Sequence, residues 1–272
     1  PSSLHAWHDD YPLAPVKQQV SADMISNYSR HVLELNEQEF QPAEKLLATL
    51  GPRQRYVVHA SALRCYVGLG MRITAVHRVM RFQESAWLEP YVSHNASQRQ
   101  RATNAFQKSF YKLLNNSIFG KTMENVRMYR NIRFCIDQEQ YLRQTKKPTY
   151  LRTVTFGVEG SLVAVEHRRS WVLLDKPIYL GQAILDLSKA VMYDFHYGVM
   201  KPLFGSKMRL LFTDTDSLAY QVTIAPGGGI DAYDMLESVK QHLDTSAFPK
   251  WHPLYSAANA RVPGKFKDEL CA

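Results

Sequence analysis

Residues 207–222 read KMRLLFTDTDSLAYQV, with two apolar runs on either side of a short polar centre. This pattern predicts a β-hairpin whose tip lies near residues 214–217. Because side chains alternate along a strand, Asp214 and Asp216 are expected to point to the same side. Two carboxylates held together between buried strands lose hydration and repel each other, so they need a counter-charge such as a divalent cation. Carboxylate oxygens suit Mg²⁺, which usually takes one or two of them and leaves room for phosphate oxygens.

The same tetrapeptide, Asp-Thr-Asp-Ser, is also compatible with an ordinary polar turn. Asp and Ser are favoured in turns because their side chains form local hydrogen bonds with the backbone. A motif this short recurs in unrelated proteins, so it does not decide between a metal site and a turn. The decision depends on the rest of the chain.

Composition narrows the class of protein. The chain has 272 residues and is 45% hydrophobic, enough for one large domain or two modest ones. Its formal charge of +8 favours a polyanionic partner such as nucleic acid. Three scattered cysteines, Cys65, Cys135 and Cys271, are too few for a disulfide framework and indicate an intracellular, reducing compartment, nuclear or cytoplasmic. With no apolar run of transmembrane length and no signal-peptide pattern, no membrane partner is expected.

Periodicity and turn residues predict a mixed α+β chain with an insertion built from strands. The expected helices are 21–37, 42–50, 84–117 with a break near 93–96, 181–200 and 231–243. The expected strands are 56–60, 71–80, 130–136, 150–156, 162–168 and 261–270, and a Gly-rich loop is expected at 227–229.

A second stretch, 101–120, reads RATNAFQKSFYKLLNNSIFG and has helical periodicity. Lys108, Lys112 and Asn116 are successive i,i+4 neighbours, and Arg101 precedes Lys108 by seven residues, so one helix face is expected to carry all four. The opposite face is expected to be an apolar packing stripe, made of Phe106, Phe110, Leu113 and Leu114. A row of cations on one helix face is usually a solvated surface.

The end of that helix favours a ligand. Residues 116–120 place an amide, a hydroxyl, an aromatic ring and a glycine within about one turn of the basic row. Lys and Arg bind phosphate, the Phe119 ring can stack on a base or sugar, and Gly120 allows close approach to the backbone. A phosphorylated, base-bearing ligand uses all of these groups.

The two stretches together resemble family B DNA polymerases. Lys112-x-x-x-Asn116-Ser117-x-Phe119-Gly120 is similar to the fingers motif of that family, and Phe212-x-Asp214-Thr215-Asp216-Ser217 is similar to its palm motif. Five fixed positions recur by chance about once in a few million starting points. The segments 121–125, 187–189 and 8–15 are similar to the protein-primed branch found in viruses and in Polinton/Maverick-type mobile elements.

The resemblance implies a template-directed DNA polymerase that adds deoxynucleotides to a primer 3′-hydroxyl with two Mg²⁺ ions, or Mn²⁺, roughly 4 Å apart. Asp216 is the implied principal metal ligand and Asp214 a supporting one, while Thr215 and Ser217 shape the turn. The implied nucleotide-binding residues are Arg101, Lys108, Lys112, Asn116, Phe119 and Gly120. The implied DNA-contacting residues are Ser217, Lys265 and Lys267, and the implied partners are a template-primer, a dNTP and, in the protein-primed branch, a terminal protein.

The resemblance also divides the chain. It assigns 1–20 to the end of the palm's first motif segment, 21–83 to a palm-associated insertion, 84–125 to the fingers helices, 126–175 to a second insertion, and 176–272 to the palm hairpin and a thumb-proximal start. Phe119 and Phe212 replace tyrosines of the family and keep the ring. The family's remaining metal-binding Asp precedes a Tyr-Pro pair that Pro1 resembles, so we expect this chain to be a fragment with that Asp upstream.

Two other functions fit the same residues. A non-catalytic nucleic-acid or nucleotide-binding remnant of such a polymerase requires salt-sensitive binding without nucleotide incorporation. A metal-dependent nuclease uses the acidic hairpin but leaves the helix motif unexplained. The polymerase is the first hypothesis, and the binding remnant is the alternative.

Overall fold

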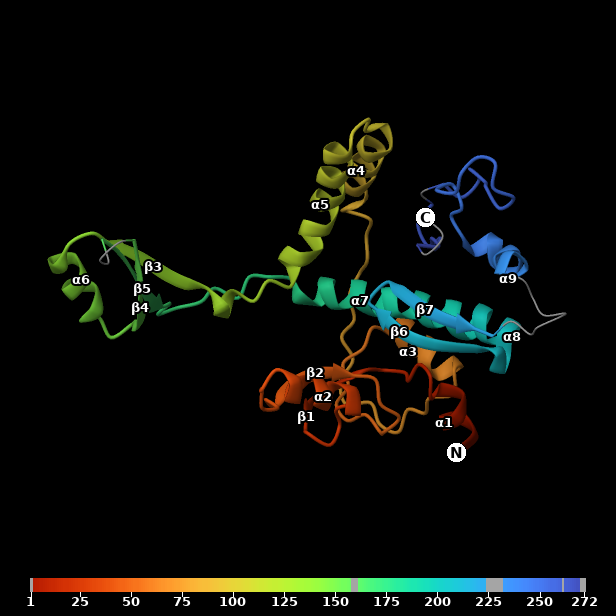
Figure 1. The fold of residues 1–272 in the computed structure, drawn as a ribbon, viewed down its shortest axis with the longest axis horizontal. Helices are drawn as coiled ribbons and strands as arrows, with labels where there is room; N and C mark the ends of the chain where they lie inside the picture. The colour runs from red at the N-terminus through yellow and green to blue at the C-terminus, as the bar shows by residue number, and fades with distance from the viewer. Residues whose placement is uncertain (1, 158–160, 224–231, 261, 270–272) are drawn as a thin grey trace. The chain divides into compact units, whose positions relative to one another are not determined.

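The structure, a computed structural model, describes residues 2–157, 161–223, 232–260 and 262–269 (Figure 1). The chain forms two compact units, one made of residues 1–81 and 183–272 and the other of residues 82–182, and each is described by itself. Helices and small antiparallel sheets make up both units, which confirms the mixed α+β class.

The first unit is built around one long helix and a hairpin. Helix α7 (Ile178–Tyr193) enters this unit at residue 183 and continues as a π-helix, η3 (Asp194–Met200), and a short helix, α8 (Lys201–Phe204). The 3₁₀ turn η4 (Gly205–Lys207) leads into the antiparallel hairpin of β6 (Met208–Asp214) and β7 (Ser217–Val222), which lies along α7 in Figure 1. Met192, Tyr193 and Leu210 are buried where helix and hairpin meet, so this contact is the core of the unit.

The amino-terminal part of the chain completes that core. It contains α1 (Ser2–His8), strand β1 (Val16–Val20), α2 (Asn27–Leu35), strand β2 (Ala43–Leu47) and α3 (Ala60–Gly68). Strands β1 and β2 pair antiparallel. Tyr11, Leu13 and Ala14 are buried against Tyr66 of α3 and against α7, so the segment before β1 is part of the hydrophobic core.

A second cluster lies near the carboxyl end. Helix α9 (Ala232–Val239) and the 3₁₀ turn η5 (Lys240–His242) bury Val239 and Leu243 against Phe195, Phe204 and Met208. Leu243 and Phe266 form an isolated parallel bridge.

The second unit contains a helix pair and a small sheet with one helix. Helices α4 (Glu89–Arg101) and α5 (Ala105–Thr122) pack together, and the 3₁₀ turn η1 (Val126–Met128) follows. The sheet has the antiparallel order β3 (Arg130–Cys135), β5 (Leu162–Arg168), β4 (Tyr150–Phe156). Helix α6 (Gln138–Thr145) packs on β3 and β5, and Cys135, Val165 and His167 are buried on the sheet.

Several expected elements differ from the observed ones. The hairpin, the strands near 130–136, 150–156 and 162–168, and the long helix near 181–200 are confirmed. The expected helix 42–50 is wrong, because its centre is strand β2. The expected strands 56–60 and 71–80 are wrong, because residues 71–80 have no helix or strand assignment and the helix α3 starts at Ala60.

Other boundaries shift. The expected helix 21–37 is shorter and begins at Asn27, after an N-cap at Ser26 whose side chain accepts from the Ser29 amide. The expected helix 231–243 is observed as α9 followed by η5. In the expected strand 261–270, the described residues carry only the bridge at Phe266. The Gly-rich loop at 227–229 lies outside the described residues.

Two further expectations concern unpaired cysteines and membrane-spanning segments. Cys65 and Cys135 are free thiols. Burial, and then the nearby Asp194 carboxylate, raise the pKa of the Cys65 thiol. None of the helices in the described ranges has the length and apolar character needed to cross a bilayer.

Candidate functional site

The acidic hairpin ends in a tight, strained turn. Asp214 pairs with Ser217, so Thr215 and Asp216 form a two-residue turn. The Asp216 amide donates to the Asp214 carbonyl oxygen at 2.5 Å, and Thr215 between them has a positive φ of 49°. A three-residue hydrogen-bonded turn with positive φ is rare and strained, and a β-branched residue makes it more so. Strain of this kind persists where the surrounding structure enforces it, and it clusters at functional sites.

Both carboxylates of this turn are exposed to solvent. Asp214 and Asp216 belong to a continuous exposed run, 211–217. The expectation that two carboxylates are buried between strands is therefore wrong, because the hairpin tip extends beyond the core that covers Leu210 and Met208. The alternation argument does not apply to the pair either, since Asp216 lies in the turn and not on a strand.

Few protein groups occupy the acceptor positions of the turn. Asp214 Oδ1 accepts from the Thr215 hydroxyl at 3.3 Å, and the Ser217 hydroxyl donates to the Asp214 carbonyl oxygen at 3.1 Å. Thr215 and Ser217 thus stabilise the turn, as expected of them. Most carboxylate lone pairs of Asp214 and Asp216 stay accessible, because an ionised carboxylate offers about four acceptor sites.

A β-bulge lies close to the tip. Leu210 pairs with Tyr220 but Phe212 pairs with Ala219, so β6 carries one extra residue, Leu211. Bulges bend a strand and occur near active sites, where they redirect side chains. In this hairpin the bulge separates the buried half of β6 from the exposed half that carries the acidic turn.

The amino-terminal segment holds the hairpin from behind. The Tyr11 side chain forms a hydrogen bond with that of Thr213, and burial raises the pKa of Tyr11 above its usual value while this bond lowers it in part. Tyr193 donates its hydroxyl hydrogen to the Pro12 carbonyl oxygen at 3.0 Å, and Tyr197 donates to the Tyr11 carbonyl oxygen at 2.5 Å. Residues 11–12 therefore link the π-helical region to β6, one residue before Asp214.

A buried histidine lies in the same region. His196 in the π-helix has no exposed surface, and its Nδ1 lies 3.0 Å from the Tyr220 hydroxyl on β7. Burial, and then the positive charge of Lys201, lower the pKa of His196 to about 4, with an opposing effect from Asp10. A neutral His196 is thus part of the hairpin's support and not an exposed acid or base.

The basic row of the second unit lies on one helix, with one exception. Lys108, Lys112 and Asn116 are exposed residues of α5, and their i,i+4 spacing puts them on one face. Arg101 does not belong to that face. Helix α4 ends at Arg101, and α5 starts after Asn104, whose side chain caps it by accepting from the Gln107 amide at 2.8 Å. The capping residue, and not a break near 93–96, divides the predicted helix.

The expected apolar packing stripe on α5 is not buried. Phe106 is 75% exposed, and Phe110 and Leu113 are also exposed, while Leu114 is half-buried. The face that packs on α4 is polar at its centre, because buried Asn95 donates to Asn115 Oδ1 at 2.9 Å. The periodicity therefore predicted the helix correctly but assigned its packing to the wrong side.

The end of α5 lies next to the segment 175–177, which the sequence did not single out. Ser117, Ile118, Lys121, Thr122 and the segment 175–177 line a hollow of about 310 Å³. Lys121 donates to Glu124 at 2.7 Å, and Lys176 lies 3.7 Å from the same carboxylate. The hydrogen bond with Glu124 raises the pKa of Lys121, and the same bond, more than the Lys176 charge, lowers the pKa of Glu124. Apart from Gly120 itself, its two chain neighbours and the backbone of its own helix turns, no heavy atom of the described residues lies within 4 Å of a Cβ built on Gly120, so this position is open to approach.

The carboxyl-terminal lysines are placed differently from each other. Lys265 donates to the Gln241 carbonyl oxygen at 2.7 Å, and Lys267 is exposed. Among the described residues of the expected strand 261–270, only Phe266 between the two lysines takes part in a bridge, so the lysines are not carried on one regular strand. Lys267 is the better placed of the two to contact a phosphate.

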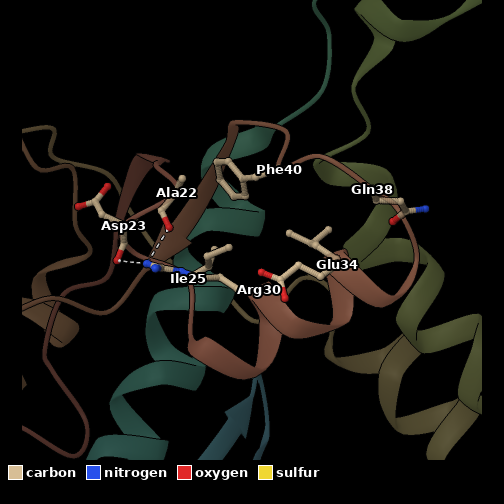
Figure 2. Close-up of a pocket in the computed structure, with 8 residues that line it drawn as sticks. Ala22, Asp23, Ile25, Arg30, Glu34, Gln38 and Phe40 are labelled. Atoms are coloured by element: carbon tan, nitrogen blue, oxygen red, sulfur yellow. Dashed lines mark hydrogen bonds between the residues drawn. The ribbon is translucent and has the colours of Figure 1, made fainter.

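Another hollow, of about 460 Å³, is lined by none of these motif residues and lies between α2 and the loops that flank it (Figure 2). Ile25, Leu33 and Phe40 line it together with charged residues. Arg30 on its wall donates to the carbonyl oxygens of Ala22 and Asp23 at 3.1 and 3.5 Å. Because this guanidinium already holds the neighbouring loop, the hollow offers little free positive charge to an anionic ligand.

The donor set at the hairpin fits a magnesium ion only in part. Asp214 and Asp216 supply two hard oxygen ligands, which is the number Mg²⁺ commonly takes when phosphates and water complete its shell. Within the described ranges, no group of three or more His, Cys, Asp or Glu side chains is placed to hold a metal ion. The two aspartates are therefore compatible with a metal shared with a phosphorylated substrate.

Comparison of the chain with protein-family models, with curated proteins and with solved structures gave no match in any of the three.

Proposed function

We propose that this chain is the palm and fingers part of a family B DNA polymerase of the protein-primed type. The observation that carries the proposal is the strained acidic turn, which presents two exposed carboxylates directly after Thr213, the residue whose side chain is hydrogen-bonded to Tyr11. The lysine row of α5, which ends in Asn116, Phe119 and Gly120, supports it as a site for a nucleotide triphosphate.

In this proposal each residue has a definite task. Asp216 and Asp214 would hold the metal ions, which supply charge stabilisation for the attacking and leaving oxygens when bound. Lys112 and Lys108 neutralise the triphosphate, and Phe119 packs against the base or sugar of the incoming nucleotide. Template base pairing provides specificity, while these groups provide position and charge. The Lys267 side chain binds a backbone phosphate of the primer strand.

Primer extension tests the proposal directly. The protein, with any residues that precede this chain in its reading frame, is assayed with a primer-template, Mg²⁺ and labelled nucleotides. Asp216→Asn is expected to remove extension, and Lys112→Ala to raise the KM for nucleotide, because each substitution removes one proposed interaction. Asp9→Asn changes an exposed carboxylate outside the site and is the matched control. Extension that survives Asp216→Asn contradicts the proposal.

A separate measurement tests the geometry that the proposal requires. Spin labels at Ser217→Cys and Asn116→Cys, in a chain with its native cysteines replaced, report the distance between hairpin and helix. Addition of primer-template and nucleotide is expected to shorten and narrow this distance, since both sites must contact one substrate. A distance distribution that the ligands leave unchanged argues against a shared site.

The alternative is a nucleic-acid-binding remnant without catalysis. The lack of a third acidic ligand among the described residues favours it. It predicts salt-sensitive DNA binding in the extended chain without incorporation at any metal concentration. The extension assay separates the two, because binding without incorporation in the parent protein supports only the remnant.

A further inference from the structure

One face of the three-stranded sheet in the second unit is open. Register partners in neighbouring strands share a face, so Phe134, Ala164 and Val154 form one row across β3, β5 and β4, and Phe156 lies in the next row opposite Leu162. The other face carries Cys135, Val165 and His167, all buried, and helix α6 packs against β3 and β5. Among the described residues the first face is the one that exposes large side chains, with Ala164 buried between them.

That open face exposes two aromatic rings. Phe134 is 64% exposed and Phe156 is 48% exposed, and Ile132 and Val154 beside them are exposed as well. The row between the two rings is low, because Ala164 on the central strand is small. Since neighbouring strands are about 5 Å apart, the residues that flank Ala164 are about 10 Å apart. Contiguous exposed apolar groups of this kind mark an interaction surface.

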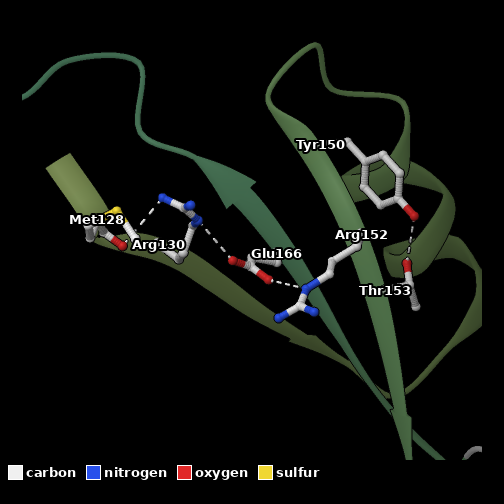
Figure 3. Close-up of polar contacts among 6 residues, drawn as sticks. All are labelled: Met128, Arg130, Tyr150, Arg152, Thr153 and Glu166. Atoms are coloured by element: carbon white, nitrogen blue, oxygen red, sulfur yellow. Dashed lines mark hydrogen bonds and ion pairs between the residues drawn. The ribbon is translucent and has the colours of Figure 1, made fainter. Parts of the chain in front are cut away.

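Arginines gather at one end of the same face (Figure 3). Glu166 on β5 lies between Arg130 Nε at 3.0 Å and Arg152 Nε at 2.6 Å. Arg168 lies directly opposite Arg130 across the β3–β5 pair. Like charges directly opposite each other destabilise a sheet. Three guanidinium groups against one carboxylate leave an excess of two positive charges beside the rings.

From this combination we infer that the open face of the β3–β5–β4 sheet binds single-stranded nucleic acid. Exposed rings on a sheet stack on unpaired bases, and the adjacent arginines bind the phosphates that those bases carry. The positive excess matches a polyanion, whereas an apolar protein partner would leave the arginines without counter-charges. The inference does not depend on the polymerase proposal, because it involves neither the acidic hairpin nor the helix motif.

Binding of a fluorescein-labelled oligothymidylate to the full chain tests the inference, without metal or nucleotide. Phe134→Ala and Phe156→Ala are each expected to weaken binding by at least about fivefold, the loss of one base stack. Phe134→Tyr, which keeps the ring, should bind as the parent does, whereas Phe134→Leu should bind as weakly as Phe134→Ala. Tyr28→Ala removes an exposed ring of α2 and should have no effect.

Substitutions of the charged residues test the arginines separately, because one of them should tighten oligonucleotide binding where the aromatic substitutions weaken it. Glu166→Gln frees Arg130 and Arg152 from their carboxylate and should tighten binding about threefold or more. Arg152→Gln should weaken it and, since one phosphate is then no longer neutralised, reduce the logarithmic slope of affinity against salt by about 0.7. Asp9→Asn, outside both the sheet and the proposed active site, should bind the oligonucleotide as the parent does. Loss of primer extension with oligonucleotide binding retained then distinguishes failure of the polymerase proposal from failure of this inference.

Three results would overturn the inference. One is binding that Phe134→Ala and Phe156→Ala leave unchanged while their melting temperatures match the parent. Another is a weaker affinity of Glu166→Gln. The third is a parent protein that is dimeric by light scattering and becomes monomeric with Phe134→Ala, which would assign the face to a second copy of the chain.

Discussion

The Tyr197 hydroxyl in the π-helix donates a hydrogen bond to the Tyr11 carbonyl oxygen at 2.5 Å, across 186 positions of sequence. The Tyr11 side chain in turn bonds that of Thr213, the neighbour of Asp214. The main chain at Tyr11 is therefore fixed on one side by the helix, and its side chain fixes β6 on the other. This arrangement sets the position of the strained acidic turn relative to the core.

Tyr197→Phe tests how much this connection contributes to stability. The substitution keeps the ring, which is buried, and removes the donor, so the Tyr11 carbonyl oxygen loses a buried partner. We expect the free energy of unfolding to fall by about 1–2 kcal/mol. Urea titration followed by circular dichroism measures it. Tyr28→Phe, at an exposed tyrosine of α2, should leave the unfolding curve unchanged.

The buried His196 predicts a pH dependence of stability. In the unfolded chain a histidine takes up its proton near pH 6.5, whereas the folded protein holds the pKa of His196 at about 4. Protonation thus favours the unfolded state. Stability from this group is fully present above pH 6.5 and falls as the pH drops towards 4, by up to about 3 kcal/mol.

The measurement is the free energy of unfolding between pH 7 and pH 4 for the parent and for the double variant His196→Phe/Tyr220→Phe. Removing both partners leaves neither ring nitrogen nor hydroxyl buried alone. Carboxylates titrate in both proteins, so the difference between the two curves isolates the histidine. Parallel curves would show that His196 is solvated in the folded state.

The local sequence pattern was sufficient to predict those elements whose pairing partners follow closely along the chain. Alternation and turn residues identify β6 and β7, because two strands joined by a two-residue turn contain their own partner. Strands β4 and β5 are likewise consecutive in the chain and pair with each other. The long helix near 181–200 is identified because its apolar positions recur over five turns.

Elements with distant partners were predicted less well. Residues 43–47 have helix punctuation on both sides, but they pair with β1, and an ion pair between Lys17 and Glu44 crosses that ladder. Residues 71–80 have a β-branched pattern, yet among the described residues no strand pairs with them. A strand pattern indicates that the residues suit a sheet, but it does not indicate that a strand to pair with is present.

The candidate site shows the same division. The acidic and lysine-bearing motifs are visible in the sequence, since chemistry depends on residue identity at short spacing. The strain at Thr215, the bulge at Leu211 and the tyrosine bonds to residues 11–12 are not, because backbone angles and long-range hydrogen bonds leave no periodic signal. Arg101 was misplaced because the non-helical residues 102–104, the last of which caps α5, interrupt a continuous helical pattern.

Thr215→Gly tests the strain at the acidic turn. Glycine adopts positive φ at little cost, so the substitution removes strain of about 1–3 kcal/mol and loses about 1 kcal/mol through the freer unfolded chain. We expect a net stabilisation of about 1 kcal/mol in a thermal or urea transition. Gln221→Gly on β7, at an exposed strand position without positive φ, should destabilise the same hairpin by about 1 kcal/mol. Equal effects of the two glycines would mean that the turn carries no strain.

Gly181 lies at a close contact between the start of α7 and the end of α5. A Cβ at this position would lie 2.1 Å from Met123 Cγ and 2.7 Å from the Thr122 hydroxyl, and Thr122 is buried. Gly181→Ala should therefore destabilise the second unit by about 1–3 kcal/mol, although alanine favours helices. Gly198→Ala in the π-helix meets its nearest atom, Asp194 Oδ1, at 3.5 Å, so it should be neutral or stabilising by up to about 1 kcal/mol. Hydrogen exchange of the α5 and α7 amides is measured in both variants. We expect faster exchange in Gly181→Ala alone, because only that alanine pushes the two helices apart.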